Sequence, residues 1–158
     1  MNNWFWYESM EIKEFKTIED FPQECFGFIY KITNTITGKF YIGKKSLYHN
    51  VKKKLTKKEL AEQSGPGRKA TTKKIQKESD WATYWGSNKE ILAEIKASNT
   101  LPFTREIIRM VRTKKELTYW ETAYQCKYNV LFTNSYNDNV LGKFFKKDFA
   151  PNALLHIL

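Results

Sequence analysis

The sequence predicts a small α+β domain: a three-stranded antiparallel sheet flanked by helices, with a basic insertion after the second strand. Two observations lead to this prediction. Segments 27–32 and 39–45 are rich in β-branched and aromatic residues, and the connector between them ends in Gly38, which is typical of a β-hairpin. Farther along the chain, two helix start signals enclose a third apolar strand.

The elements follow one another in a simple order. Residues 1–25 form an aromatic N-terminal lead-in, in which 11–16 is a candidate short strand. Residues 26–140 form the main domain, which contains the basic insertion at 45–80, and residues 141–158 form a basic and aromatic C-terminal tail. No internal repeat is visible, so we expect one main domain.

Two capping boxes place the helices of the main domain. Ser87 is followed three residues later by Glu, which predicts a helix over 88–97. Thr113 begins the same pattern and predicts a helix over 114–129. The apolar segment 103–111 lies between them and predicts the third strand.

The insertion at 45–80 is rich in lysine and poor in acidic residues. We expect a short helix at 55–63 and a loop elsewhere, which becomes ordered on binding. Its charge favours contact with DNA, and a solvated linker is the alternative. The cations that we expect to contact DNA are Lys44, His49, Lys52, Lys53, Lys54, Arg68 and Lys69.

The whole composition points in the same direction. The net charge is +10 and aromatic residues make up 16% of the chain, which favours a nucleic-acid partner because lysines neutralise phosphates and aromatic rings stack on bases. Cys25 and Cys126 stand far apart without a CxxC pattern, so we expect two reduced thiols in the core rather than a zinc site or a disulfide. Neither a signal peptide nor a membrane-spanning run is visible, which predicts a cytoplasmic protein without a membrane partner.

Glu121 stands out in the second predicted helix. Leu117, Glu121, Tyr124 and Tyr128 recur at spacings of four, three and four, which places Glu121 on or beside the inward stripe. A carboxylate in that position is costly unless it is paired or holds a metal. Periodicity alone favours a pair with a neighbouring lysine, and a metal site is the alternative.

Tyr30 and Tyr41 lie in the two hairpin strands, close to Gly43, Lys44 and Lys45. A glycine at this strand end allows close backbone approach. A phenol held near cations or a metal ionises more easily and could act as a general base for water. A divalent ion held by a carboxylate could bind the scissile phosphate, and hard oxygen ligands favour Mg²⁺, with Mn²⁺ as a substitute.

These residues carry a resemblance to a known family. Phe28-Ile29-Tyr30 followed by Tyr41-Ile42-Gly43 resembles the hallmark of the GIY-YIG endonucleases. Glu121 resembles the metal-binding glutamate of that family, and Asn137 resembles its late asparagine. The segment 78–87 resembles the phage-encoded Seg-type homing endonucleases. The resemblance extends over about 26–140.

The resemblance implies metal-dependent hydrolysis of phosphodiester bonds in double-stranded DNA by a phage homing-type nuclease. In this reading Tyr30 is the general base and Tyr41 orients the water or the phosphate. Glu121 holds the Mg²⁺ ion, Lys45 polarises the site of attack, and Asn137 braces the fold around the site.

The sequence departs from the family pattern in two places. Phe28 stands where the first motif usually begins with glycine, and the window 49–54 lacks the arginine that usually faces the phosphate. Lys52 or Arg68 would have to supply that charge, although a lysine lacks the bidentate fork of arginine. A non-catalytic nucleic-acid-binding protein with the nuclease fold is therefore an alternative. A structural or interaction protein is a third, but it leaves the two tyrosines and Glu121 unexplained.

Overall fold

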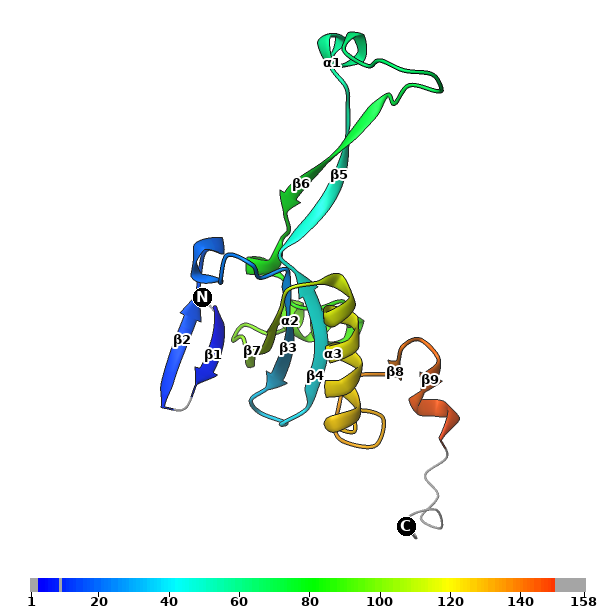
Figure 1. The fold of residues 1–158 in the computed structure, drawn as a ribbon. Helices are drawn as coiled ribbons and strands as arrows, with labels where there is room; N and C mark the ends of the chain where they lie inside the picture. Colours follow the sequence, from blue (N-terminus) through cyan, green and yellow to red (C-terminus); the bar gives the residue numbers. More distant parts are fainter. Residues whose placement is uncertain (1–2, 9, 150–158) are drawn as a thin grey trace.

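The fold is built around one five-stranded mixed sheet (Figure 1). The computed structural model describes residues 3–8 and 10–149. The strands lie in the order β2-β1-β7-β3-β4, with bounds Glu11–Phe15, Trp4–Glu8, Phe103–Val111, Gly27–Asn34 and Phe40–Ser46. β1 runs parallel to β7, and the other neighbours are antiparallel. The predicted α+β class agrees with this fold, but the sheet has five strands rather than three and is not purely antiparallel.

The two additional strands come from the N-terminal lead-in. Trp4 and Phe15 are paired across β1 and β2, and both are buried. The indole Nε1 of Trp4 donates a 2.8 Å hydrogen bond to the carbonyl oxygen of Trp81. Strand β1 thus pairs with β7, about 100 residues away in the sequence, and this pairing places the aromatic side chain of Trp4 in the core. The short 3₁₀ turn η1, Ile18–Asp20, follows β2 and leads towards β3.

The predicted hairpin is present as β3 and β4. Asn34 begins its turn: the side-chain oxygen accepts hydrogen bonds from the backbone N–H groups of Ile36 and Thr37. Gly38 has φ +71°, a left-handed conformation that glycine adopts at little cost. The turn residues thus explain why this pairing could be recognised from local sequence.

The basic insertion is mostly ordered as a projecting arm, which we define as residues 48–78 (Figure 1). Its two strands, β5 (Tyr48–Lys54) and β6 (Thr72–Glu78), pair antiparallel along their whole length. The short helix α1, Lys57–Ala61, begins in a capping box and lies at the far end. The predicted helix is therefore present, whereas the loop prediction is wrong for the residues of β5 and β6, which satisfy each other's backbone groups.

The remaining predicted elements lie close to their expected positions. Helix α2 spans Lys89–Ala97, strand β7 follows, and helix α3 spans Lys114–Lys127. Thr113 caps α3 as predicted, but the N-cap of α2 is Asn88 rather than Ser87, because the Asn88 side chain accepts the hydrogen bond from the N–H of Ile91. The turn η2, Trp81–Thr83, links the arm to this part of the chain.

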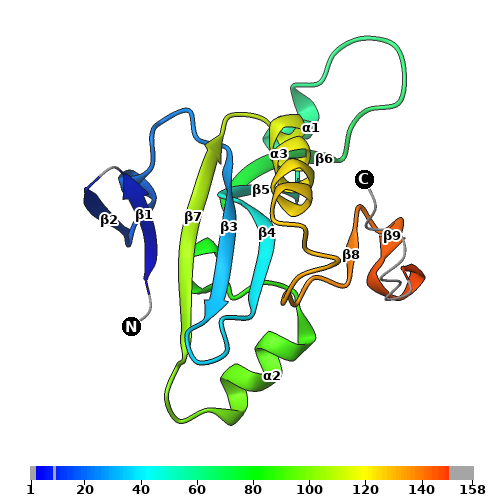
Figure 2. The same cartoon turned by 90° about the horizontal axis from the view of Figure 1, so that it is seen from below.

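Apolar side chains cover both faces of the sheet. On one face, Phe28 and Tyr30 of β3 pack with Trp4, Trp81 and Ile91, the last of these from α2. On the other face, a second cluster joins the sheet to α3; its buried members are Ile29, Ile42, Val111, Leu117, Val130 and Val140. Figure 2 shows the strands between the two helices. Adjacent residues of β3 and β4 therefore point into different clusters, which decides how the candidate site is assembled.

The two cysteines differ in environment. Both are free thiols, as predicted; Cys25 is buried, whereas Cys126 is exposed. The expectation of two core thiols is therefore wrong for Cys126, because its position on α3 faces solvent. Burial raises the pKa of the Cys25 thiol above its ordinary value.

The C-terminal part forms a small separate ladder. β8 (Asn139–Val140) pairs with β9 (Phe144–Phe145), and the turn η3, Lys146–Asp148, follows. The predicted basic and aromatic tail continues to residue 158, but its part from 150 onward lies outside the described residues. Among the residues described, none of the helices has the length and apolar character needed to span a bilayer.

Candidate active site

The two hairpin tyrosines lie on the same face of the sheet. Tyr30 is the strand partner of Gly43, and Tyr41 is the partner of Ile32. The ring centroids of the two tyrosines are 6.1 Å apart. A Cβ atom on Gly43 would lie 2.4 Å from the Tyr30 hydroxyl oxygen and 2.8 Å from Cε1 of Tyr41. Gly43 therefore provides the space in which the two phenols meet.

Burial controls the ionisation of both phenols. Tyr30 is 1% exposed, and burial raises its pKa well above the ordinary value; the hydroxyls of Tyr41 and Tyr84 and the charge of Glu121 act in the same direction. Burial also raises the pKa of Tyr41, partly offset by a hydrogen bond with Ser87. The expectation that nearby lysines favour the phenolate is therefore not met in the protein alone, because loss of hydration has the larger effect.

A third tyrosine, Tyr84, completes this cluster and was missed by the sequence prediction. Its ring centroid lies 6.1 Å from that of Tyr30, with the two rings nearly perpendicular. Arg105 holds the segment in place by donating hydrogen bonds of 3.0 and 2.9 Å to the carbonyl oxygens of Ala82 and Tyr84. Burial lowers the pKa of Arg105 to about 10, so the guanidinium stays charged at neutral pH. Tyr84 lies within the segment 78–87 that resembles the Seg-type enzymes, and this resemblance was the signal in the sequence that could have identified it.

Lys45 joins the tyrosine cluster to an acidic residue. Its Nζ lies 3.8 Å from the ring centroid of Tyr84 and 2.5 Å from Oδ1 of Asp80. Lys45 and Asp80 hold opposite charges together, and this pairing lowers the pKa of the Asp80 carboxyl. The predicted Lys45 therefore lies beside the tyrosines, but its charge is already matched by Asp80, which sequence reasoning did not identify.

Glu121 reaches β4 from the opposite side of the sheet. Helix α3 packs on β3 and β4, and the Glu121 side chain is 20% exposed. Its Oε2 forms a 2.8 Å ion pair with Nζ of Lys44, which also lies 3.3 Å from Oγ1 of Thr118. The prediction of a partly inward Glu121 is confirmed, and so is the pair with a neighbouring lysine that periodicity alone favoured. Glu121 and the two phenols thus flank the same strand, β4, from opposite faces, and the charge of Glu121 contributes to the raised pKa of both Tyr30 and Tyr41.

Asn137 binds the backbone of this edge strand directly. Its side chain accepts a 2.9 Å hydrogen bond from the N–H of Ile42 and donates a 2.8 Å hydrogen bond to the carbonyl oxygen of the same residue. Gln125 of α3, which the sequence prediction missed, also donates to that carbonyl, at 3.2 Å. Asn137 thus replaces a neighbouring strand at the residue between Tyr41 and Gly43.

Asn137→Ala should destabilise the protein by about 1–3 kcal/mol. The substitution leaves the Ile42 N–H buried without its partner, while the Ile42 carbonyl keeps Gln125. Urea unfolding of the variant and the wild type measures the difference. Asn134→Ala is the matched control, because Asn134 is an exposed amide that donates to the carbonyl of Thr37, and its loss should change stability by less than about 0.5 kcal/mol. Equal effects of the two substitutions would contradict the proposed brace.

The residues present fit a hard divalent ion with few protein ligands. Among the residues described there is no group of three or more His, Cys, Asp or Glu side chains that could enclose a metal. Mg²⁺ in nucleotide-processing sites commonly keeps several waters and takes one or two carboxylates together with substrate phosphates. The partly exposed Glu121 carboxylate suits that mode of binding, and the sole competing cation in contact with it among the described residues is Lys44.

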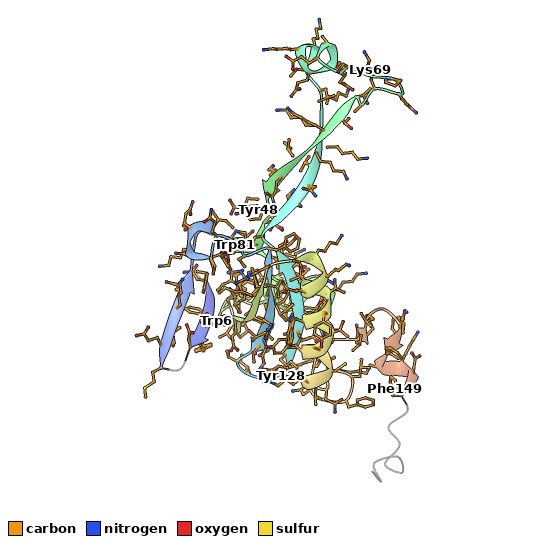
Figure 3. All side chains as sticks on the ribbon, viewed as in Figure 1. Trp6, Tyr48, Lys69, Trp81, Tyr128 and Phe149 are labelled. Carbon is orange, nitrogen blue, oxygen red and sulfur yellow. The ribbon has the colours of Figure 1, made fainter. Side chains whose placement is uncertain are left out.

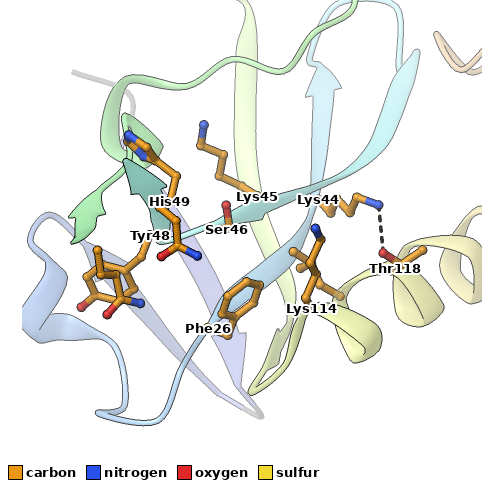
Figure 4. Close-up of a pocket in the computed structure, with 11 residues that line it drawn as sticks. Phe26, Lys44, Lys45, Ser46, Tyr48, His49, Lys114 and Thr118 are labelled. Carbon is orange, nitrogen blue, oxygen red and sulfur yellow. Dashed lines mark hydrogen bonds between the residues drawn. The ribbon is translucent and has the colours of Figure 1, made fainter. Parts of the chain in front are cut away.

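The cations expected to contact DNA separate into two groups. Lys44 and His49 line a pocket of about 500 Å³ between the base of the arm, β4 and the start of α3, together with Lys45 and Lys114. Figure 4 shows Lys44 directed towards Thr118, with Lys114 nearby and Lys45 pointing away from Lys44. The other predicted cations, Lys52, Lys53, Lys54, Arg68 and Lys69, all lie on the arm.

Arg68 does not complete the tyrosine and Glu121 site. It lies beside Lys69, which Figure 3 marks at the far end of the arm. Lys52 projects from β5 and is also part of the arm. The two lysines that do reach the site are Lys44 and Lys45, which follow Gly43 directly along β4. The arrangement therefore places lysine charge on both faces of β4, beside Tyr84 and Asp80 on one face and beside Glu121 on the other.

Comparison with known proteins is consistent with this geometry. A family model described as "Putative endonuclease segE, GIY-YIG domain" matches residues 6–147. Neither the curated proteins nor the solved structures gave a significant match. The matched range includes the tyrosines, Glu121, Asn137 and the whole arm, and it begins within β1.

Proposed function

Because the chain belongs to the SegE-type GIY-YIG endonuclease family, we propose that it is a metal-dependent endonuclease that hydrolyses phosphodiester bonds in double-stranded DNA. A nuclease domain implies a nucleic-acid substrate. One observation supports the rest of the proposal: Tyr30 and Tyr41 lie on one face of β4, and Glu121 lies on the other face, paired with Lys44. β4 is the last strand of the sheet, and residues 134–137 cover its outer edge at Phe40 and Ile42. A DNA backbone would therefore approach β4 beyond Ile42, where Lys44, Lys45 and Ser46 line the pocket.

Tyr41 is the better candidate to contact the attacking water. Tyr30 is buried and its raised pKa keeps it protonated, so it cannot readily accept a proton. Tyr41 is partly exposed and its ring lies beside that of Tyr30. We therefore assign orientation of the attacking water to Tyr41. Its own pKa is also raised, so in this proposal the phenol holds the water by a hydrogen bond and the proton of the water passes to solvent. Tyr30, whose ring packs against those of Tyr84 and Tyr41, positions the Tyr41 ring.

Glu121 is the residue that would hold a divalent ion. Such an ion, when bound, supplies positive charge that polarises the phosphate and stabilises the leaving oxygen. Lys44 forms an ion pair with the Glu121 carboxylate and would compete with the divalent ion for it. Released from Glu121, the Lys44 ammonium would remain at the same edge of β4, where it can attract the phosphate.

Lys45 and Asn137 have supporting roles in this proposal. Lys45 is held over the Tyr84 ring. Its ammonium can polarise the site of attack once its ion pair with Asp80 is broken and it contacts the phosphate instead. Asn137 touches neither substrate nor water in this proposal. It is a positioning residue that holds the β4 backbone at Ile42, between Tyr41 and Gly43. This role agrees with its burial, at 3% exposed.

A non-catalytic nucleic-acid-binding protein is the second candidate. The observation that favours it is the state of the two lysines at the site: Lys44 is paired with Glu121, and Lys45 is paired with Asp80. Both must leave a carboxylate before they can neutralise a phosphate. DNA binding without cleavage in the presence of any divalent ion would support this alternative.

The biological setting rests on the segment 78–87, which resembles the phage-encoded Seg-type enzymes. We propose on that basis a homing-type nuclease that acts in the cytoplasm of the host cell. The segment also has a structural use: it supplies Asp80, Tyr84 and Ser87 to the tyrosine and lysine cluster. Its resemblance to the Seg-type enzymes therefore coincides with residues of the candidate site.

Removal of divalent ions should abolish cleavage and leave DNA binding intact. The purified protein is incubated with a mixture of phage and host DNA in Mg²⁺, in Mn²⁺ and in EDTA, and the products are separated on denaturing and native gels. Cleavage is expected with either ion and should be absent in EDTA. Without the ion, the negatively charged Glu121 supplies no positive charge to stabilise the leaving oxygen. A gel-shift assay in EDTA should still detect the complex. Cleavage in EDTA at the rate seen in Mg²⁺ would contradict the metal-dependent mechanism.

A further inference from the structure

The arm accounts for most of the net positive charge of the protein but contributes little to its core. Residues 48–78 contain ten Lys or Arg and three Glu, a net charge of +7 out of +10 for the whole chain. All seven residues of β6 are exposed. In Figure 1 the arm stands away from the sheet. Burial of apolar surface therefore does not explain why this segment forms two paired strands.

The strand register even places like charges opposite one another. Lys52 lies opposite Lys74, and Lys53 lies opposite Lys73. Lys73 forms an ion pair with Glu59 of α1. Among the described residues, Lys52 and Lys74 have no ion-pair partner within 4 Å. Like charges directly opposite in a ladder destabilise it, so this pairing is best explained by a polyanionic partner.

The arm has two faces of different chemistry. Directly opposite residues share a face, so the inner face, as we name it, carries Tyr48, Asn50, Lys52, Lys54, Thr72, Lys74, Gln76 and Glu78. The outer face carries His49, Val51, Lys53, Lys73, Ile75 and Lys77. On the inner face Asn50 lies directly opposite Gln76, so the central pair carries two amides. On the outer face the equivalent central pair is apolar, Val51 with Ile75.

The inner face continues into the candidate active site. Tyr48, Asn50 and Gln76 of the inner face line the same pocket as Lys44 and Lys114, and His49 is the outer-face residue that also lines it. Lys44 is in turn the partner of Glu121. The pocket thus joins Lys44, the partner of Glu121, to the two amides of the arm, and Lys52 and Lys74 lie opposite each other two residues farther out on β5 and β6.

We propose that the arm enters the major groove of double-stranded DNA with its inner face turned towards the base edges. This inference rests on the proposed endonuclease function and adds how the substrate is held and read. The major groove, about 12 Å wide, admits a two-stranded β-ribbon, whereas the minor groove, about 6 Å wide, is too narrow. Seven residues of each strand extend about 24 Å, which corresponds to about seven base pairs.

Asn50 and Gln76 are the residues that read sequence in this arrangement. Asn and Gln side chains form bidentate hydrogen bonds with N6 and N7 of adenine in the major groove. Lys52 and Lys74 lie two residues farther along each strand and would contact phosphates, which adds affinity without sequence information. The enzyme is therefore expected to prefer adenine at one or two positions beside the cleavage site.

Two charge-matched double variants test which face meets DNA. K52Q/K74Q removes two charges from the inner face, and K53Q/K77Q removes two charges from the outer face. Binding to a random-sequence 30-bp duplex is measured in EDTA by fluorescence anisotropy across a salt titration. K52Q/K74Q should weaken binding and reduce the slope of log K against log salt by about 2. K53Q/K77Q should leave the slope unchanged. Equal slopes for the two variants would overturn the proposal.

A second measurement tests base reading. Bound duplexes are selected from a randomised pool with the wild type and with N50A/Q76A. The wild type should enrich adenine, and the variant should lose about 5- to 150-fold of discrimination at each contacted position. Replacing the selected adenines by 7-deazaadenine removes N7 and should weaken the wild type but not the variant. Retention of the adenine preference by N50A/Q76A, or equal binding of an RNA duplex of the same sequence, would overturn the proposal.

These results are separable from the proposed catalytic function. Binding is measured in EDTA, where no cleavage is expected, and the arm substitutions leave Glu121 unchanged. If the arm variants bind as the wild type does while cleavage still requires Glu121, this inference fails and the proposed function stands. If the arm binds as proposed but cleavage does not require Glu121, the proposed mechanism fails and the binding inference stands.

Discussion

Glu121→Gln should reduce DNA cleavage at least about a thousand-fold while leaving the fold and DNA binding in place. A bound divalent ion contributes several kcal/mol of charge stabilisation to such a reaction, and each 1.4 kcal/mol corresponds to a factor of ten in rate. Gln keeps the shape of the side chain but loses the charge that holds the ion. Single-turnover cleavage in saturating Mg²⁺ measures the effect.

Stability and binding should respond differently from cleavage in this variant. The Glu121–Lys44 pair is partly exposed, so its loss should cost no more than about 1 kcal/mol. Removal of a negative charge beside a basic pocket should leave DNA affinity equal to that of the wild type or higher. These two measurements separate loss of catalysis from loss of structure.

Glu90→Gln is the matched control for this experiment. Glu90 lies on α2 and pairs with Lys39 at 2.7 Å, so the substitution also removes one carboxylate from one lysine pair. It should cleave DNA at the wild-type rate. Cleavage by Glu121→Gln at a rate close to that of Glu90→Gln would contradict the assignment of Glu121 as the metal ligand.

Gly43→Ala should lower both stability and activity, because the added methyl group collides with the tyrosine pair. The new Cβ would lie 2.4 Å from the Tyr30 hydroxyl oxygen, 2.6 Å from its Cζ and 2.8 Å from Cε1 of Tyr41. Tyr30 packs against the rings of Trp4, Phe28 and Tyr84, so it cannot move aside without disturbing the core. Overpacking of this kind costs about 1–3 kcal/mol. Chemical unfolding and the cleavage assay measure the two effects.

A double-mutant cycle shows whether Tyr30 is the source of that cost. Tyr30→Leu shortens the side chain and removes the atoms nearest to the new methyl group. In the Tyr30→Leu background, Gly43→Ala should therefore cost less than half of its effect in the wild type, which gives a coupling free energy between the two sites. An equal cost in both backgrounds would place the effect in the β4 backbone and contradict the packing argument.

Local sequence predicted the elements whose signals are local. The hairpin at 27–45 has a glycine turn, and the capping box at Thr113 begins α3. Helical spacing placed Glu121 towards the sheet, and the ion pair with Lys44 bears this out. The family match agrees with the resemblance seen in the hairpin motifs, Glu121 and Asn137. These features depend on residues a few positions apart, so a single sequence contains them.

Features that depend on distant pairing were not predicted. β1 joins the sheet through a parallel partner about 100 residues away, and the arm strands are separated by 17 residues whose composition resembles a loop. Tyr84 reaches Tyr30 because Arg105 of β7 holds its backbone. Nothing in the local pattern around these residues specifies such partners.

The sequence alone determined the chemistry available to the protein: two tyrosines beside a glycine, an inward carboxylate, a late asparagine and an excess of lysine. The tertiary structure decided how that chemistry is arranged. Strand alternation sends Tyr41 and Lys45 to one face of β4 and Lys44 to the other, where Glu121 meets it. Burial then raises the pKa of Tyr30, although lysines lie nearby. Burial and pairing arise from contacts between segments far apart in the chain, which is why the structure was needed to assign them.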